Sequence, residues 1–301
     1  MLIALTGSSG LIGSALISAF TAQGHTCVRL VRSNTPSTST DVQWNPESEE
    51  RLNDHRLEDL DVVIHLAGEN IAGRWTKDKK AKILQSRVRG TSNLSRSLAN
   101  LGKRPKLFLS ASAIGYYGDT GDHEIDESAG PGQGFLPSVC VAWEAATEAA
   151  VQAGIRVVNM RIGVVLSPSG GLLQKILPIF RRGVGGKLGG GHQYMSWITL
   201  EDIVKAVGFL IENESIQGPV NLCSPVPTTN LEFTNALGRA LSRPTIFPVP
   251  YWAAKLALGQ MADETAFLSS RVLPSILLKN SYTFQESDLQ DALSEILARQ
   301  A

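Results

Sequence analysis

The sequence predicts an α/β fold, a doubly wound parallel sheet followed by a smaller, mostly helical C-terminal lobe. Short apolar runs bounded by glycine, serine, asparagine or charge alternate with longer amphipathic stretches, as strands alternate with helices in such folds. A glycine-rich turn also joins the first apolar run directly to the first amphipathic stretch. With 301 residues, 43% of them hydrophobic, the chain is long enough to bury a large core.

Five apolar runs, most of them rich in Val, Ile and Leu, have the pattern of buried strands. They are residues 2–5, 26–31, 61–66, 107–109 and 157–160. Three stretches with apolar residues at helical spacing are predicted to be helices, namely residues 11–23, 77–101 and 136–153. Because these helices would connect successive strands, we expect the strands to be parallel and covered on both faces. We interpret residues 1–166 as this domain.

Beyond residue 166 the pattern changes, and loops rich in glycine and proline become frequent, as in the glycine-dense segment 183–191. Four further helices are predicted, near residues 200–213, 230–242, 251–260 and 286–298. We interpret residues 167–301 as a lobe on the substrate side, with some of its segments returning to the sheet.

Composition excludes several classes of protein. The 28 Lys and Arg residues balance the 28 Asp and Glu residues, so the chain lacks an electrostatic footprint for nucleic acid or an anionic membrane. No apolar run is long enough for a transmembrane helix, and the N-terminus lacks the basic start of a signal peptide. The three cysteines and five histidines are scattered, which argues against a disulfide framework or a metal site. We expect a cytoplasmic protein that acts on a small molecule. Whether it forms a homodimer is left open by the sequence.

The strongest local signal is the glycine motif of residues 7–13 (GSSGLIG), which follows the first predicted strand and opens the first predicted helix. Gly7 permits a tight turn, Gly10 lets the backbone approach a pyrophosphate, and Gly13 lets helix and strand pack closely. The free amides at the start of the helix then face the anion. The residues of this turn predicted to contact a dinucleotide are Gly7, Ser9, Gly10, Leu11, Ile12 and Gly13.

The end of the second predicted strand indicates which dinucleotide is bound. NAD-binding proteins place an acidic residue there to bind the ribose hydroxyls, whereas a nearby arginine accommodates the 2′-phosphate of NADP. This chain has no acid at the end of residues 28–33 (VRLVRS) and instead has Arg32. A guanidinium can form two hydrogen bonds to a phosphate, so we predict NADP(H) as the cofactor.

Further motifs follow in order along the chain. They include residues 61–68 (DVVIHLAG), 86–91 (SRVRGT), 110–112 (SAS), 115–118 (GYYG) and 161–166 (RIGVVL). Together they resemble the atypical extended short-chain dehydrogenases/reductases, a branch of the NAD-dependent epimerase/dehydratase superfamily. Members are often labelled "epimerase family protein" and sometimes "cell-division inhibitor". The resemblance covers almost the whole chain and is far more specific for the branch than for a reaction.

The resemblance implies further contacts with the cofactor, since matching residues line the cofactor cleft in this branch. Those residues are Leu66, Ala67, Gly68 and Glu69 in the cleft, Arg87 reaching back to it, and Val165 near the nicotinamide side. The family's Trp-Ile-His reads Trp197-Ile198-Thr199 here, which puts a substrate contact at position 199 in doubt. Trp197 is expected to form a wall of the cleft between the lobes. Asp202 is interpreted as an N-terminal helix charge.

The catalytic residues of the extended enzymes are only partly matched. Such enzymes typically use a Ser or Thr with a Tyr-x-x-x-Lys pair, in which the lysine lowers the pKa of the tyrosine. Ser112 stands where the serine is expected, but Cys140 occupies the tyrosine position and Glu144 the lysine position. A carboxylate there would raise the pKa of a neighbouring phenol or thiol. The usual relay is absent.

Three interpretations stay open. The first is a divergent NADP-dependent oxidoreductase or epimerase for a small carbonyl or sugar-like substrate, using Ser112 with Tyr116, Tyr117 or Glu144 as the substitute acid. Cys140 is more readily an inert helix thiol. The second is a non-catalytic NADP(H)-sensing regulator, suggested by the missing relay. The third is a structural or interaction protein, which no repeat or charged tail supports.

Overall fold

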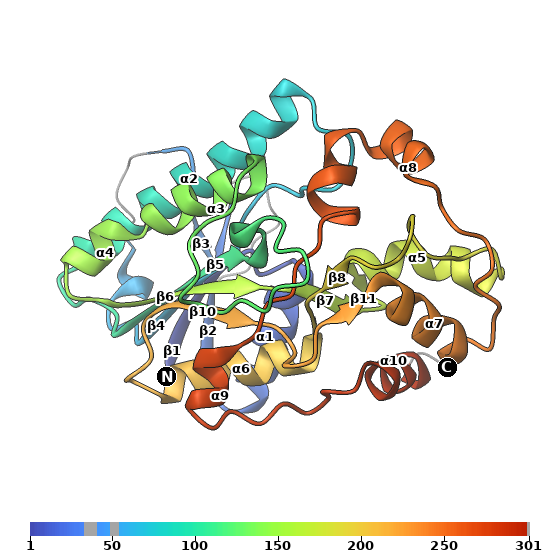
Figure 1. The fold of residues 1–301 in the computed structure, drawn as a ribbon. Coiled ribbons are helices and arrows are strands. Elements are labelled where there is room, and N and C mark those ends of the chain that lie inside the picture. Colours follow the sequence, from blue (N-terminus) through green and yellow to red (C-terminus); the bar gives the residue numbers. More distant parts are fainter. Residues whose placement is uncertain (33–40, 49–53, 300–301) are drawn as a thin grey trace.

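The computed structural model describes residues 1–32, 41–48 and 54–299, and its main feature is a sheet of seven parallel strands (Figure 1). The strand order is β10-β6-β5-β4-β1-β2-β3. The strands are β1 (Leu2–Thr6), β2 (Thr26–Val31), β3 (Val42–Gln43), β4 (Val62–His65), β5 (Leu107–Ala113), β6 (Arg156–Ile162) and β10 (Gly218–Leu222). The order reverses at β1, with β2 on one side and β4 on the other, as in a doubly wound Rossmann-like sheet.

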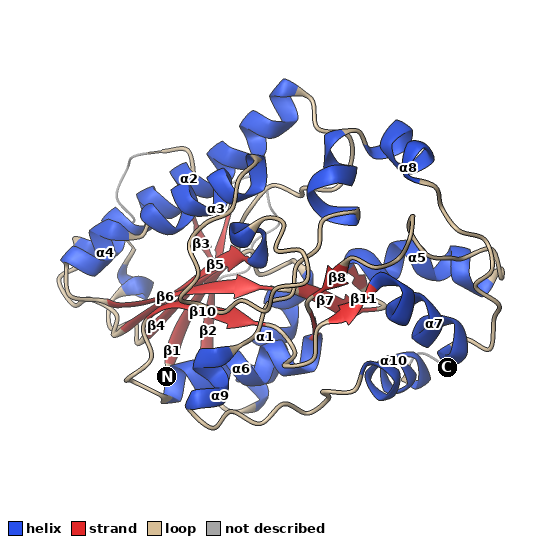
Figure 2. Ribbon diagram, viewed as in Figure 1, coloured by secondary structure: helices blue, strands red, loops and turns tan. Residues whose placement is uncertain are grey.

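Helices cover both faces of the sheet (Figure 2). One layer consists of α2 (Lys77–Ala99), α3 (Phe135–Ala145) and α4 (Glu148–Gln152), and the opposite layer of α1 (Leu11–Ala22), α6 (Leu200–Glu212) and α9 (Ser275–Lys279). Side chains on the two faces of each strand therefore enter different cores. Ile3 and Leu5 of β1, for example, lie in one core with Leu16 of α1, whereas Ala4 lies in the other with Leu94 of α2.

A smaller lobe lies beyond the carboxyl edge of the sheet, at the right of Figure 1. Its strands are β7 (Val164–Ser167), β8 (Tyr194–Met195), β9 (Trp197–Thr199) and β11 (Thr228–Thr229). Its helices are α5 (Gly171–Arg181), α7 (Asn230–Ala240), α8 (Tyr251–Leu258) and α10 (Leu289–Ala298). Three short segments complete the fold, namely the 3-10 turns η1 (His55–Leu57) and η2 (Ile114–Tyr117) and the π-helical turn η3 (Ala262–Ala266).

The predicted parallel α/β sheet is confirmed, while two details differ. The helix predicted over residues 136–153 is interrupted after Ala145, where the Thr147 hydroxyl donates to the Glu144 carbonyl and competes with the helical pattern. The short strands and α5 were not predicted because they contain too few residues, or too many glycines and prolines, for a periodic signal. β10 joins the sheet from the C-terminal part of the chain, and the boundary after residue 166 stays a prediction. No described helix is long and apolar enough to cross a membrane.

A buried hydrogen-bonded pair joins β1 and β4 at the point where the strand order reverses. The hydroxyl of Thr6 lies 2.6 Å from Nδ1 of His65 and accepts hydrogen bonds from the amides of Leu66 and Ala67. His65 is fully buried against Trp44, and its Nε2 has no partner among the described residues. Burial lowers the pKa of His65 from 6.5 to about 3. The neutral imidazole is therefore part of the folded core.

We predict that His65 makes the fold acid-sensitive. Because the pKa of His65 in the folded state lies below its unfolded value, its contribution to stability is present above pH 6.5 and is lost as the pH falls towards about 3. The slope from this one group is about 1.4 kcal/mol per pH unit. Urea unfolding of the wild type and of His65→Asn between pH 7 and pH 4 measures it. The variant should be less stable at pH 7 but should show a flatter profile, and equal slopes would contradict the prediction.

Candidate functional site

The glycine turn between β1 and α1 is packed too closely for side chains at two of its positions. Gly7 has φ +68°, and a Cβ atom on it would lie 2.8 Å from the carbonyl carbon of Leu66. A Cβ atom on Gly13 would lie 2.3 Å from the carbonyl oxygen of Gly7. These glycines therefore bring the start of α1 against the carboxyl ends of β1 and β4.

Internal packing does not explain Gly10, the middle glycine of the turn. A Cβ atom on Gly10 would meet only the Gly7 carbonyl oxygen, at 3.3 Å, and Gly10 is exposed with φ −78°. As the N-cap of α1 it offers no side chain to the first amides, and the first turn contains no acidic residue. The start of α1 thus presents open amides and a positive helix dipole, which suit an anionic group. Ser9 is exposed beside it, whereas Leu11 and Ile12 are half-buried.

Arg32 follows the buried end of β2 and is exposed. The residues after it, 33–40, lie outside the described part of the chain. The described acid nearest in sequence, Asp41, is engaged elsewhere, because both of its carboxylate oxygens accept hydrogen bonds from Arg29 at 2.5–2.7 Å. Arg32 therefore remains an exposed cation at the end of the second strand.

The guanidinium of Arg87, on α2, contacts the turn after β4. A Cβ atom on Gly68 would lie 3.3 Å from the Arg87 guanidinium, which donates to the carbonyl of Glu69 at 2.9 Å and lies over the Trp143 ring at 4.8 Å. Burial lowers the pKa of Arg87 from its usual value. Arg87 thus fixes the backbone of this turn, and its predicted role towards a cofactor stays a prediction.

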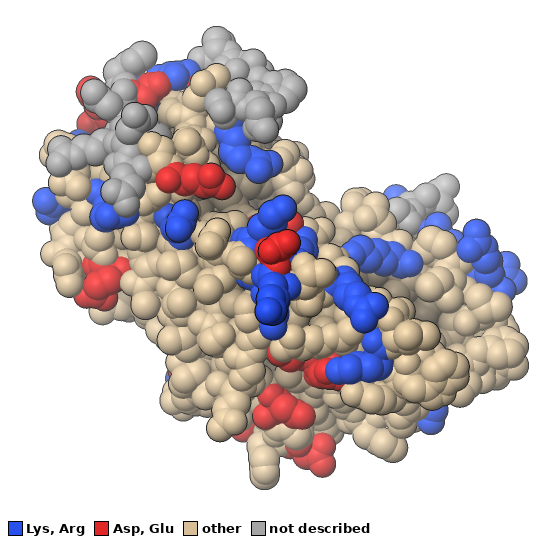
Figure 3. Space-filling model, turned by 90° about the horizontal axis from the view of Figure 1, so that it is seen from above, with Lys and Arg blue, Asp and Glu red and all other residues tan. Residues whose placement is uncertain are grey.

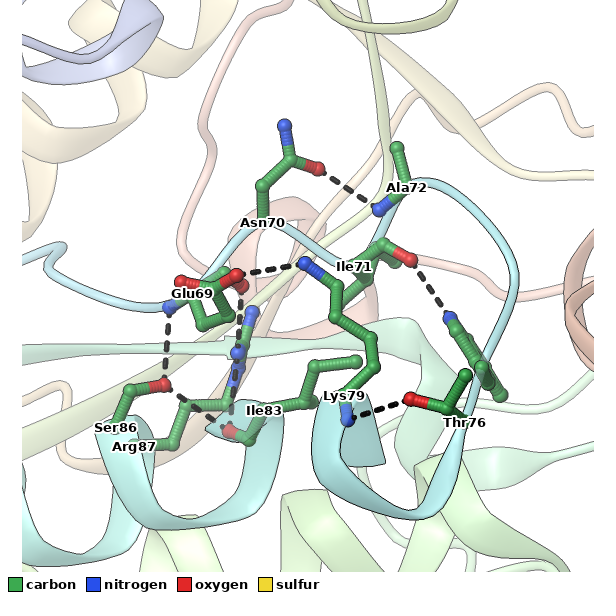
Figure 4. Close-up of polar contacts among 10 residues, drawn as sticks. Glu69, Asn70, Ile71, Ala72, Thr76, Lys79, Ile83, Ser86 and Arg87 are labelled. Atoms are coloured by element: carbon green, nitrogen blue, oxygen red, sulfur yellow. Dashed lines mark hydrogen bonds and ion pairs between the residues drawn. The ribbon is translucent and has the colours of Figure 1, made fainter. Parts of the chain in front are cut away.

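The loop that begins with Glu69 is attached to the start of α2 (Figure 4). The Glu69 carboxylate pairs with the Lys79 ammonium at 2.6 Å, and the Glu69 amide donates to the Ser86 hydroxyl at 3.0 Å. The hydrogen bond from Lys79 lowers the pKa of Glu69 below its usual value. Leu66 packs against one core and Ala67 against the other. The predicted cleft residues, 66–69, are thus consecutive residues of the segment that follows β4.

Exposed charged side chains lie at and near the start of α2, and blue and red side chains lie together near the middle of the view in Figure 3. Arg74, Lys77 and Lys82 are exposed there. Cations at a helix N-terminus interact unfavourably with the helix dipole. Asp78 in the first turn of α2 is exposed as well and offsets part of this positive charge.

Ser112, at the carboxyl end of β5, belongs to a buried ionic network. Its hydroxyl donates to Oε1 of Glu144 on α3 at 2.6 Å. Both carboxylate oxygens of Glu144 also accept from the Arg161 guanidinium, each at 2.8 Å. The two charged side chains are 13% and 3% exposed. Burial disfavours the charged form of Arg161, but the hydrogen bonds and charge interactions with Glu144 and Tyr117 together outweigh it and raise the pKa of Arg161.

Tyr117 is a buried member of this network. Its hydroxyl donates to Oδ1 of Asn221 at 2.8 Å and accepts from the Arg161 guanidinium at 2.9 Å. Burial raises the pKa of Tyr117 to about 12, although the charge of Arg161 opposes the shift. Asn221 in turn donates to the Leu273 carbonyl at 2.9 Å. The Tyr117 hydroxyl therefore has its donor and an acceptor position occupied within the protein.

Tyr116 lies differently. The guanidinium of Arg161 is stacked over the Tyr116 ring at 3.5 Å, and the rings of Tyr116 and Tyr117 meet edge to face at 5.3 Å. No described residue forms a hydrogen bond with the Tyr116 hydroxyl, and the side chain is half-buried. Of the two predicted tyrosines, Tyr116 is the one whose hydroxyl is free.

Cys140 is buried on α3, one helical turn before Glu144. Burial raises the pKa of the Cys140 thiol to about 12, and the charge of Glu144 adds to the shift. A thiol of this kind is a poor nucleophile at neutral pH, which agrees with its interpretation as an inert helix residue.

One expectation about the lobe requires correction, and another requires an addition. Trp197 does not form a wall of a cleft, because it is fully buried in the lobe core with Leu173 and Phe233. Thr199 is buried and caps α6, accepting from the Asp202 amide at 3.0 Å, so its side chain has a structural role.

The interpretation of Asp202 as a helix charge was incomplete. Its carboxylate also accepts from the Gln285 amide at 2.8 Å. Val165 is half-buried on β7.

Arg161 and Asn221 are the members of the network that the sequence analysis did not single out. A signal for Arg161 was present, since it is the one charged residue in the apolar run of residues 157–166 (VVNMRIGVVL). A charge in a buried strand requires a partner of opposite sign. The partner, Glu144, could not be identified from the sequence because it lies on a different element, helix α3, which packs on the sheet.

Comparison with known proteins identifies relatives over the whole chain. Residues 3–223 match the model of the NAD dependent epimerase/dehydratase family, and residues 249–296 match a domain of unknown function, DUF1731. An epimerase family protein of Mycobacterium bovis is 46% identical over 298 residues, which are 99% of this chain and 98% of that protein. The epimerase family protein YfhF of Bacillus subtilis is 35% identical over 302 residues, with 99% and 98% covered.

Solved structures show the same relationship. The human epimerase family protein SDR39U1 (isoform 2), crystallised with NADPH, superposes with a TM-score of 0.91 at 29% identity, covering 99% of both chains. UDP-glucose 4-epimerase of Thermus thermophilus, in complex with NAD, superposes with a TM-score of 0.76 at 17% identity, covering 100% of this chain and 99% of that one. The second likeness shows the fold alone.

The contrast between the two tyrosines gives a prediction for stability. Tyr117→Phe should lower the free energy of unfolding by about 1–3 kcal/mol, because buried groups on Asn221 and Arg161 lose a partner. Tyr116→Phe keeps the stacked ring and should change it by no more than about 0.5 kcal/mol. Urea unfolding of both variants measures the difference, and similar losses would show that the network is wrongly described.

Proposed function

This chain belongs to the NAD-dependent epimerase/dehydratase family, and we propose that it is an NADP(H)-dependent oxidoreductase or epimerase for a small carbonyl or sugar-like substrate. The observation that carries the proposal is the position of the Ser112–Glu144 pair. It lies at the carboxyl edge of the same sheet at which the glycine turn presents the open start of α1. Ligands of doubly wound sheets bind along that edge.

The glycine turn fits a dinucleotide. Gly10 has no packing reason to lack a side chain, and the amides that follow it have no cap from a side chain. An approaching pyrophosphate would account for both features. In our proposal Gly7, Gly10, Ile12 and Gly13 form this cradle, and the turn from Leu66 to Glu69, held by Arg87, forms the adjacent wall. When bound, the nicotinamide would donate or accept a hydride.

Two observations favour NADP(H) over NAD. Arg32 is an exposed cation at the end of β2, where a 2′-phosphate would require one. The human relative was crystallised with NADPH, whereas more distant neighbours of the same fold contain NAD.

The geometry around Ser112 supports proton transfer without the usual tyrosine–lysine pair. Because the Ser112 hydroxyl donates to Glu144, its oxygen lone pairs remain to accept a hydrogen bond from a substrate hydroxyl. During oxidation of that hydroxyl, its proton would move to Ser112 Oγ while the Ser112 proton moves to the Glu144 carboxylate. Reduction of a carbonyl would run the same path in reverse.

Tyr116 is the second candidate for proton exchange. Its hydroxyl is free, and the Arg161 guanidinium lies on its ring, so a positive charge stands beside the phenol as the lysine does in the usual relay. Tyr117 is a weaker candidate, because its hydroxyl is bound to Asn221 and Arg161 and burial holds its pKa near 12. We therefore assign Tyr117 a supporting role.

One observation favours the alternative of a non-catalytic NADP(H)-sensing regulator. Glu144 accepts three hydrogen bonds, two of them from Arg161, so the network is complete without a substrate. In a regulator this network would stabilise one conformation, and the cofactor would shift the population of conformations. Binding of NADP(H) without turnover of any substrate is the outcome that would distinguish a regulator from an enzyme.

The cofactor assignment predicts two different defects in binding. Arg32→Ala should weaken NADPH binding about 10–100-fold and leave NADH binding unchanged, because only NADPH offers the 2′-phosphate. Gly10→Ala should weaken both cofactors about tenfold or more with little loss of thermal stability, because its Cβ atom would enter the cradle. Fluorescence titration and thermal unfolding measure these effects. An Arg32→Ala variant that keeps the wild-type preference, or a wild type with none, would refute the NADP assignment.

The proton path predicts the effect of removing Ser112. Ser112→Ala should lower the rate of NADPH consumption about 100-fold or more while NADPH binding stays the same. Absorbance assays against a panel of small ketones, aldehydes and keto-sugars measure turnover. Ser110→Ala, two residues earlier on β5, is the matched control, because the Ser110 hydroxyl does not reach Glu144. Unchanged turnover in Ser112→Ala would exclude this residue from the reaction.

A further inference from the structure

Helix α3, which carries Glu144, begins without a cap of its own. Its N-cap is Gly134, and its first turn contains no acidic residue. Its third residue is Pro137, which has no amide hydrogen, and the Ser138 amide already donates to the Gly134 carbonyl. The amides of Phe135 and Leu136 are therefore the open donors at this end of the helix.

Glu264, in the π-helical turn η3, binds one of these two amides. Its Oε2 accepts from the Leu136 amide at 2.8 Å, although the two residues are 128 positions apart in the sequence. A Cβ atom on Gly134 would lie 3.3 Å from the same oxygen, and Gly134 has φ +123°. The glycine thus leaves room for a carboxylate whose negative charge also suits the positive end of the helix dipole.

The segment that contains Glu264 contacts both parts of the molecule. Towards the sheet domain, Gln260 joins Glu264 to Lys80 of α2, with distances of 2.6 Å to Glu264 Oε1 and 3.1 Å to Lys80 Nζ. Met261 packs against the apolar cluster around Trp75, beneath the start of α2. In Figure 1 this segment is the orange-red chain between α8 and the start of α2.

Towards the lobe, the same segment is bound at its other end. The Ala266 carbonyl accepts from Gln193 at 3.1 Å, and the Phe267 ring meets the Tyr251 ring at 5.0 Å. Residues 259–267 therefore span from the lobe to helices α2 and α3. They lie within residues 249–296, which match the domain of unknown function.

We infer that Glu264 is a positioning residue of the candidate site: by capping α3 it holds Glu144 in the place where it meets Ser112. The inference rests on the proposed function in so far as Glu144 takes part in the reaction. A helix moves largely as a unit, so release of its first turn would also loosen Glu144, ten residues after Gly134. This gives the C-terminal segment a specific task, namely to fix a helix of the sheet domain.

The test compares Glu264→Ala with Glu264→Gln and with the control Asp263→Asn. Asp263 is the neighbouring acid on η3 and pairs with Lys255 and Tyr251 of α8, not with α3. Hydrogen exchange of residues 135–145 reports on α3 directly. Alkylation of Cys140 by iodoacetamide, measured by mass spectrometry relative to half-exposed Cys27, reports on opening beside Glu144.

Glu264→Ala should accelerate both exchange in α3 and alkylation of Cys140 about tenfold, while exchange in α6 stays at the wild-type rate. Glu264→Gln keeps an acceptor for the Leu136 amide but loses the charge, so its effect should be smaller, about two- to threefold. If Glu264→Ala does not fold, Glu264→Gln carries the test alone. Wild-type rates in the folded Glu264 variants, or an equal change in Asp263→Asn, would overturn the inference.

NADPH titration separates this inference from the proposed function. The hydrogen bonds of Glu264 go to Leu136 and Gln260 and not to the glycine turn on β1 and α1. Glu264→Ala should therefore still bind NADPH, and any loss that reaches the cofactor wall through Trp143 and Arg87 should be well below the tenfold or more expected of Gly10→Ala. A wild type that does not bind NADPH would refute the proposed function and leave the exchange result standing. Wild-type exchange with normal NADPH binding would refute the positioning role alone.

Discussion

The buried ion pair between Arg161 and Glu144 is the interaction on which the arrangement of the candidate site depends. Arg161 lies on β6, the second strand from one edge of the sheet, and is 3% exposed, so its charge requires a partner within the protein. Glu144 accepts two hydrogen bonds from Arg161 and Tyr117 accepts a third, while the Tyr116 ring covers one face of the guanidinium. Removal of either charged side chain alone would leave the other buried and uncompensated, a change that typically costs about 3–5 kcal/mol.

This pair also explains how the site accommodates a carboxylate where related enzymes have a lysine. In the usual relay the positive charge comes from a helix and stands beside the tyrosine. Here the helix contributes the negative charge of Glu144, and the positive charge comes from β6 through Arg161. Arg161 then contacts both tyrosines, so a cation still stands beside a phenol. Helix and strand thus carry charges opposite to those of the usual relay, while a positive charge still lies near the carboxyl edge of the sheet.

The parts of the structure that follow from local sequence could be predicted. The strand and helix periodicity gives the sheet, and the spacing of Gly7, Gly10 and Gly13 gives the turn, because both depend on residues close together in the chain. The network around Ser112 could not be predicted, since Glu144 meets Arg161 only through the packing of α3 on the sheet. Trp197 shows the same limit, because its position after the glycine-dense segment suggested a wall of the cleft but its side chain is in the lobe core.

The two ends of α3 show how the fold and the site depend on each other. A carboxylate near the carboxyl end of a helix, as Glu144 is, interacts unfavourably with the helix dipole, and the positive amino end of α3 has no acid of its own. Both conditions are met by charges from distant parts of the chain, Arg161 at one end and Glu264 at the other. The signs of these charges are those that the dipole requires. The helix is therefore held by a strand of the sheet domain and by a segment of the C-terminal region, and the position of Glu144 depends on both.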